Sequence, residues 1–137
     1  MKVYSKIPLV GAQLRTQRQQ LPKGGLVEVV WLTITHQSIG KESLNVIGIY
    51  VSPKTSLADL NAYLKNMLIH LRDSHTILLG DFNTDLMKTT AGVLSSLQGY
   101  KQCIGVPTTD YQSLLDHIYT NISTYELIWV IIPFNVI

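Results

Sequence analysis

The chain has 137 residues, of which 46% are hydrophobic and 15% charged, a composition that fits one folded domain and excludes disorder of the whole chain. The single cysteine, Cys103, excludes an internal disulfide framework and a zinc site built mainly from cysteines. The formal net charge of +2 is too small to indicate a nucleic-acid partner by itself. Since no run approaches the roughly 18 apolar residues of a membrane span, we expect an intracellular protein, nuclear or cytoplasmic.

The basic residues are concentrated near the N-terminus. Five of the eleven lysines and arginines precede Glu28, the first acidic residue: Lys2, Lys6, Arg15, Arg18 and Lys23. This distribution predicts a basic N-terminal arm over residues 1–25, followed by a domain over residues 26–137. Such an arm could contact phosphates, and the alternative is a solvated, partly disordered leader.

Two apolar, β-branched runs of strand length follow the Gly24-Gly25 break, over Leu26–Thr35 and Leu44–Val51. The polar connection between them contains Gly40, which predicts an antiparallel hairpin. A helix is predicted over Ser56–Arg72, with Ser56 as N-cap and Asp59 in the capping-box position. Its leucines recur at helical spacing and predict a buried stripe: Leu57, Leu60, Leu64, Leu68 and Leu71.

Short apolar runs in the second half complete the predicted sheet. Thr76–Leu79 follows the helix, so we expect it to join the strand at Leu44–Val51 through a crossover. A weak helix is predicted over Val93–Gln98, and strands over Tyr100–Ile104 and Leu114–Thr120. The fold class is therefore α/β, a mixed sheet with packed helices.

Asp81 and Asn83 are the first candidates for chemistry because they lie two residues apart at a strand exit. The carboxylate can accept a proton from water, and the amide can orient that water. The alternative is a turn without catalytic function, since both residue types favour turns. Tyr50 ends an earlier strand, where its hydroxyl could donate to a phosphate oxygen or form part of a core edge.

Asp116 lies within an apolar strand, so it must face solvent or hold a partner such as a histidine or a metal ion. His117 must face the opposite side of a regular strand, which favours a core or surface role over a shared site. Asp85 and Asp110 could approach a metal, although solvation in a loop is the simpler expectation. The other histidines, His36, His70 and His75, show no metal-ligand spacing.

Three blocks, in order and spacing, resemble the endonuclease/exonuclease/phosphatase superfamily: Leu44–Pro53, Ile77–Asn83 and Leu114–Asn121, with an amphipathic helix after the first. The nearest likeness is to the apurinic-type endonuclease domains of LINE-like retrotransposons, which accompany reverse transcriptases. The resemblance covers Leu26 to Asn121. It implies a two-sheet α/β sandwich and Mg²⁺-assisted hydrolysis of phosphodiesters, with DNA as the partner.

The resemblance also implies a role for each candidate residue. Asp81 would activate or orient the attacking water, and Asn83 would help to hold that water and the phosphate. Tyr50 would stabilise the pentacovalent phosphoryl group, and Asp116 would orient a catalytic histidine. These are the catalytic residues that we predict.

The sequence departs from the family pattern in places that bear on activity. The metal-binding glutamate of the family has no counterpart before Leu26, and Glu28 is not assigned that role. The Ser-Asp-His block is absent, and Thr109 stands where an arginine often follows the Pro-Thr pair. We therefore expect a partial domain with impaired phosphodiesterase activity. The alternative is a non-catalytic retroelement remnant that binds nucleic acid or a protein partner.

Overall fold

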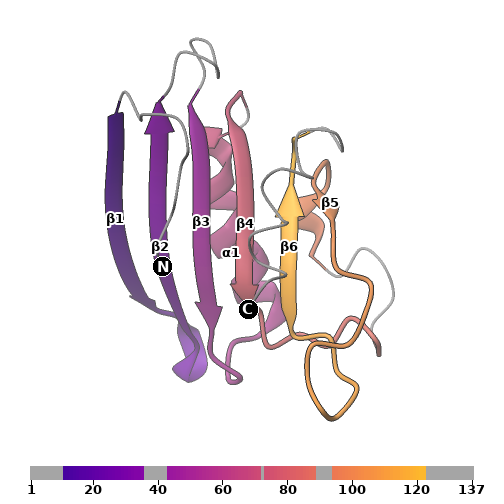
Figure 1. The fold of residues 1–137 in the computed structure, drawn as a ribbon. Helices are drawn as coiled ribbons and strands as arrows, with labels where there is room; N and C mark the ends of the chain where they lie inside the picture. Colours follow the sequence, from indigo (N-terminus) through magenta and orange to yellow (C-terminus); the bar gives the residue numbers. More distant parts are fainter. Residues whose placement is uncertain (1–10, 36–42, 72, 89–93, 123–137) are drawn as a thin grey trace.

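The computed structural model describes residues 11–35, 43–71, 73–88 and 94–122 of the chain. These residues form one six-stranded mixed sheet in the order β1-β2-β3-β4-β6-β5 (Figure 1). The strands are β1 (Gly11–Gln20), β2 (Leu26–Thr35), β3 (Leu44–Val51), β4 (His75–Asp81), β5 (Lys101–Gln102) and β6 (Asp116–Thr120). Helix α1 (Leu57–Leu68) covers one face of the sheet. The predicted α/β class is confirmed.

The central pairings agree with the sequence prediction. β2 and β3 pair antiparallel as the predicted hairpin, and both strands have the predicted bounds. β3 and β4 pair in parallel, with α1 in the crossover between them. β6 pairs antiparallel with β4 and with the two-residue β5, which is shorter than the strand expected over Tyr100–Ile104.

Strand β1 differs from the basic arm expected over residues 1–25. All ten of its residues pair with β2, so residues 11–20 extend the sheet instead of preceding it. Every one of these residues is exposed, and the strand therefore lacks the alternation of apolar and polar residues that marks a half-buried strand. Backbone hydrogen bonds to β2 hold β1 in the sheet, and such bonds require no particular residue types, so the sequence does not reveal the strand. Residues 1–10 of the expected arm lie outside the described residues.

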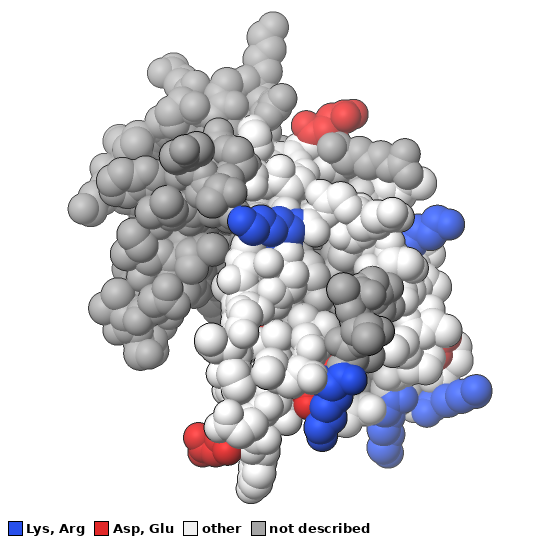
Figure 2. Space-filling model, turned by 90° about the vertical axis from the view of Figure 1, so that its right-hand side faces the viewer, with Lys and Arg blue, Asp and Glu red and all other residues white. Residues whose placement is uncertain are grey.

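The two ends of the sheet carry different loops. β3 and β4 both finish at the end where β6 begins, and the turn η1 (Pro22–Gly24) between β1 and β2 lies at that end too (Figure 1). Basic side chains gather toward this end in Figure 2, beside acidic ones. We call it the site end below, because it holds the predicted site residues.

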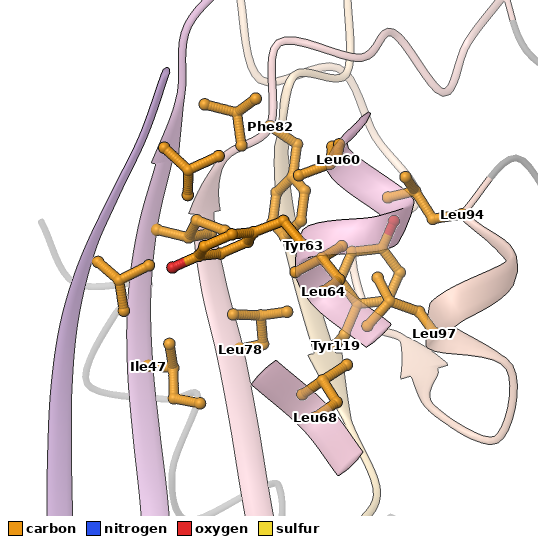
Figure 3. Close-up of a cluster of buried hydrophobic side chains, with 14 of the residues drawn as sticks. Ile47, Leu60, Tyr63, Leu64, Leu68, Leu78, Phe82, Leu94, Leu97 and Tyr119 are labelled. Atoms are coloured by element: carbon orange, nitrogen blue, oxygen red, sulfur yellow. The ribbon is translucent and has the colours of Figure 1, made fainter. Parts of the chain in front are cut away.

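Helix α1 begins as the sequence predicts and supplies most of the helical part of the core. The Ser56 Oγ accepts a hydrogen bond from the Asp59 backbone N–H at 3.2 Å, which caps the first turn. Leu60, Leu64 and Leu68 pack on the sheet beside Ile47, Leu78 and Phe82 (Figure 3). Leu57 is exposed instead, and Tyr63 is buried in the cluster.

Shorter elements close the structure. A 3₁₀ turn, η3 (Ile69–Leu71), continues α1. Of the helix predicted over Val93–Gln98, the described part forms the 3₁₀ turn η4 (Ser95–Leu97), and Val93 lies outside the described residues. Within the described parts of the chain, no helix has the length and apolar character needed to cross a membrane.

Candidate functional site

Three of the four predicted catalytic residues occupy neighbouring positions at the site end. Tyr50 on β3 is in register with Asp81 on β4, and Asp81 is in register with Asp116 on β6. Residues directly opposite one another on paired strands project from the same face. Because Ile49 and Val51 point into the core under α1, this row projects from the other face. We refer to Tyr50, Asp81 and Asp116 as the catalytic row, because the sequence predicts a catalytic role for each of them.

The row is accessible from solvent. Tyr50 and Asp116 are exposed, and Asp81 is half-buried. A reactant can therefore reach all three side chains from one side of the sheet. Register places the two aspartates on neighbouring strands and Tyr50 on the other side of Asp81, a set that combines a proton acceptor, oxygen ligands for a cation and a hydrogen-bond donor.

Gly80 allows Asp81 to reach this position. Its φ of +146° is rarely adopted by residues with a side chain, and a Cβ on Gly80 would lie 1.9 Å from the carbonyl oxygen of Ile49. Only glycine lets β4 approach β3 so closely at this point. The sequence predicts the strand over Thr76–Leu79, whereas the pairing continues through Gly80 to Asp81.

Asn83 lies just beyond the row and holds the loop after β4 in place. Its backbone N–H donates to Asp81 Oδ1 at 2.9 Å, and its side-chain amide donates to the carbonyl oxygen of Val51. Its φ of 48° is left-handed, a conformation that asparagine tolerates. One side-chain N–H and the amide oxygen remain to bind a reactant. Asn83 thus links the ends of β3 and β4 beside the Asp81 carboxylate.

His117 lies in the core, on the opposite face from Asp116, as strand alternation predicts. Its Nε2 donates to the carbonyl oxygens of Thr84 at 2.8 Å and Leu114 at 3.1 Å, and its Nδ1 accepts from the Tyr119 hydroxyl at 3.0 Å. The ring stacks on Phe82 with centroids 4.7 Å apart. Burial lowers the pKa of His117 and raises that of Tyr119 to about 12, so both stay neutral at pH 7.

Asp85 has a structural role that the sequence analysis missed. Its Oδ1 accepts hydrogen bonds from the backbone N–H groups of Leu114 and Met87, each at 3.0 Å. The bond from Leu114 is the main reason that the pKa of Asp85 lies below its usual value. Asp85 therefore ties the loop after β4 to the residues that enter β6. An aspartate often accepts a hydrogen bond from the backbone N–H two residues later, so the bond from Met87 could be expected. Nothing in the sequence indicates the bond from Leu114, which lies 29 residues away.

Thr108 holds the backbone at the start of β6, next to Asp116. Its Oγ1 accepts hydrogen bonds from the backbone N–H groups of Leu115 at 3.1 Å and Asp116 at 3.2 Å. Asp116 is thus fixed through its backbone while its carboxylate stays in solvent. Asp110, the other loop carboxylate considered above, is exposed.

The carboxylates of the row suit a hard cation. Across the described segments no group of three or more histidine, cysteine, aspartate or glutamate side chains could enclose a metal ion. Mg²⁺ is commonly held by one or two carboxylates together with water and substrate phosphate oxygens. Asp81 and Asp116 fit that mode, and a fully protein-enclosed metal site does not fit.

The row continues toward the edge of the sheet. Glu28 on β2 is in register with Tyr50, and Arg18 on β1 is in register with Glu28. Glu28 Oε1 lies 3.5 Å from Arg18 Nε. No local pattern predicts a role for either residue at this site, because strand pairing places Glu28 beside Tyr50 and Arg18 one strand further out.

Comparison with solved structures identifies proteins of the same fold. The chain is similar to an endonuclease/exonuclease/phosphatase family protein from Leptotrichia buccalis C-1013-b, with 16% identity and a TM-score of 0.56, over 84% of this chain and 51% of that one. It is also similar to the mannosyl-6-phosphatase Bt3783 of Bacteroides thetaiotaomicron VPI-5482, with 15% identity and a TM-score of 0.51, over 69% and 43%. The chain shares the fold of endonuclease/exonuclease/phosphatase proteins.

The similarity is limited to the fold and to part of each protein. This chain spans about half the length of the two solved structures. No protein-family model and no curated protein sequence matches it.

Proposed function

We propose that the chain is a metal-dependent phosphodiesterase that hydrolyses DNA, of the apurinic-type endonuclease kind found in LINE-like retrotransposons. The observation that carries this proposal is the register of Tyr50, Asp81 and Asp116, which gathers three predicted catalytic residues from distant parts of the sequence on one accessible face. The fold similarity to endonuclease/exonuclease/phosphatase proteins supports it. Phosphoryl transfer depends mainly on positioning and charge neutralisation, which this row can supply.

Each residue has a role that its position allows. Asp81 accepts a proton from water as the water oxygen bonds to phosphorus and the bond from phosphorus to the leaving ester oxygen breaks; that oxygen takes a proton from solvent. The Asn83 backbone N–H holds the Asp81 carboxylate in place. The free side-chain N–H of Asn83 and the Tyr50 hydroxyl donate to non-bridging phosphate oxygens. Asp81 and Asp116 would hold Mg²⁺, which neutralises charge on the phosphate when bound.

The same geometry explains why we expect weak activity from this chain alone. Among the described residues the row offers two carboxylates, Asp81 and Asp116, so a bound Mg²⁺ would depend on water and on the substrate for its other ligands. Asp116 has no histidine to orient in the described segments, because His117 faces the core. The proposal is thus hydrolysis at a low rate, and the alternative is a remnant that binds nucleic acid or a protein partner without cleaving.

A plasmid-nicking assay with the purified chain in Mg²⁺ tests the proposal. We expect nicking that EDTA abolishes and that Asp81→Asn and Asp116→Asn each reduce on the order of 10²-fold. Asp73→Asn is the matched control, since Asp73 is exposed and precedes β4 at the opposite end of the sheet. Nicking that survives both substitutions in the row would contradict the site. DNA binding without nicking would favour the remnant.

A further inference from the structure

The catalytic row is part of a longer row that carries carboxylates at three positions and a single cation at its β1 end. In register order the row runs Arg18, Glu28, Tyr50, Asp81, Asp116. Toward β6 it holds two carboxylates. Toward β1 it ends in a guanidinium group whose side chain is 66% exposed.

Two lysines stand at the same end of the sheet as Arg18. Lys23 lies in the η1 turn that joins β1 to β2, and Lys54 lies in the loop after β3. That loop is bound to the start of β2, because the Leu26 backbone N–H donates to the hydroxyls of Ser52 and Thr55. Lys54 leans toward the turn, since a Cβ on Gly24 would lie 3.7 Å from Lys54 Cδ. We call Arg18, Lys23 and Lys54 the cationic flank.

Arg18 is held but still able to bind an anion. The contact with Glu28 is made at Nε, at 3.5 Å. A guanidinium has five N–H donors in a planar fork, so the terminal nitrogens can still bind two oxygens of one phosphate. An exposed ion pair of this kind contributes little to the free energy of unfolding, so Arg18 can bind an anion without the loss of a large stabilising interaction.

Distance separates the flank from the catalytic row. Paired strands lie roughly 4.8 Å apart, so Arg18 on β1 is about 14 Å from Asp81 on β4, measured across the sheet. A single phosphate group beside Asp81 is too small to contact Arg18 as well. A substrate therefore uses both ends of the row only if it carries a second phosphate.

We propose that the cationic flank binds a second phosphate of the substrate backbone, so that the site selects a polynucleotide over an ester with one phosphate. This inference rests on the proposed function and names its substrate class. The scissile phosphate lies beside Tyr50 and Asp81, and a phosphate further along the same backbone binds Arg18, while Lys23 and Lys54 add positive charge at this end of the sheet.

Two double variants of equal charge test the flank. The first is Arg18→Gln/Lys54→Gln. The control is Arg15→Gln/Lys65→Gln, because Arg15 is on β1 but stacks over Trp31 on the other face, and Lys65 is exposed in the last turn of α1. Both remove two positive charges, so only position differs. Circular dichroism and thermal melting check that both variants fold.

Binding of a fluorescent 20-base-pair DNA duplex is measured by anisotropy over a range of NaCl concentrations, in EDTA. The flank variant should raise Kd roughly tenfold at 0.1 M salt and flatten the slope of log K against log salt by about 1 to 2. The control should change Kd less than about twofold. Equal losses of affinity in both variants would overturn the inference, because net charge alone would then explain binding. An unchanged Kd in the flank variant would overturn it too, because the flank would then not contact the DNA.

Cleavage assays distinguish failure of the phosphate-binding flank from failure of the proposed hydrolase function. In Mg²⁺ the flank variant should lose about tenfold in kcat/KM on the duplex and keep its rate on bis-p-nitrophenyl phosphate, which carries one phosphodiester. An equal loss on both substrates would overturn the flank. If wild type binds DNA through the flank but cleaves neither substrate, the hydrolase proposal fails and the phosphate-binding flank stands.

Discussion

Strands β4 and β1 belong to the same sheet but are stabilised in different ways. β4 pairs on both sides, with β3 and β6, and places Leu78 in the core beneath α1. Among the described strands β1 pairs only with β2, and all ten of its residues are exposed. β4 therefore depends on side-chain packing, whereas β1 depends on backbone hydrogen bonds. The catalytic row takes its two carboxylates from the paired strands β4 and β6, whereas Arg18 of the cationic flank lies on the edge strand β1.

The largest effect should come from substitution of Gly80. Gly80→Ala places a methyl group 1.9 Å from the Ile49 carbonyl oxygen at a left-handed φ, so β3 and β4 must separate. We expect a loss of more than about 4 kcal/mol in the free energy of unfolding, or no folded protein, measured by urea denaturation. Gly105→Ala is the control, because no atom lies within 4 Å of its added Cβ. Equal stability of the two variants would contradict the close approach of the strands.

Two leucine truncations compare the regions directly. Leu64→Ala removes a fully buried side chain from the core and should cost about 2–5 kcal/mol of unfolding free energy. Leu14→Ala removes a β1 side chain that is 61% exposed and should cost less than about 0.5 kcal/mol. Urea denaturation of both variants measures the difference. A loss of unfolding free energy in Leu14→Ala as large as that in Leu64→Ala would show that the Leu14 side chain is buried in solution.

The smallest effect concerns the dependence of stability on pH. The pKa of His117 is lower in the folded state than in the unfolded state because the ring is buried. The unfolded state therefore binds more protons below about pH 6.5, and stability falls as pH decreases from there, by at most about 1.4 kcal/mol per pH unit. Above that pH the contribution is complete.

His117→Phe keeps a ring stacked on Phe82 and removes the titrating group. Its unfolding free energy should fall less between pH 6.5 and 5 than that of the wild type. His70→Gln, a change at an exposed histidine, should keep the wild-type slope. A wild-type slope in the His117 variant would mean that another group sets the pH dependence.

The sequence predicts the packed region well because burial leaves a pattern in it. Strands β2 and β3 have their expected bounds, and the leucine repeat and Ser56 locate α1. Strand alternation also places His117 away from Asp116. β1 was missed because an edge strand exposed on both faces needs no apolar alternation.

The candidate site could be predicted only in part. Residue types and the family resemblance select Tyr50, Asp81, Asn83 and Asp116, but their proximity depends on pairings between residues more than 30 positions apart. Strand register likewise places Glu28 beside Tyr50 and Arg18 beside Glu28, and the bond from Leu114 to Asp85 joins residues 29 positions apart. Long-range register is set by the packing of the whole sheet, which no local pattern encodes.

Gly80 and Asp81 are neighbours subject to different constraints. Replacing Gly80 disrupts the approach of β4 to β3, whereas replacing Asp81 alters a half-buried carboxylate and leaves the pairing intact. A lineage released from selection for cleavage can lose the aspartate and still keep its fold, but it cannot lose the glycine. Variation at these two adjacent codons among close relatives would therefore distinguish selection for folding from selection for catalysis.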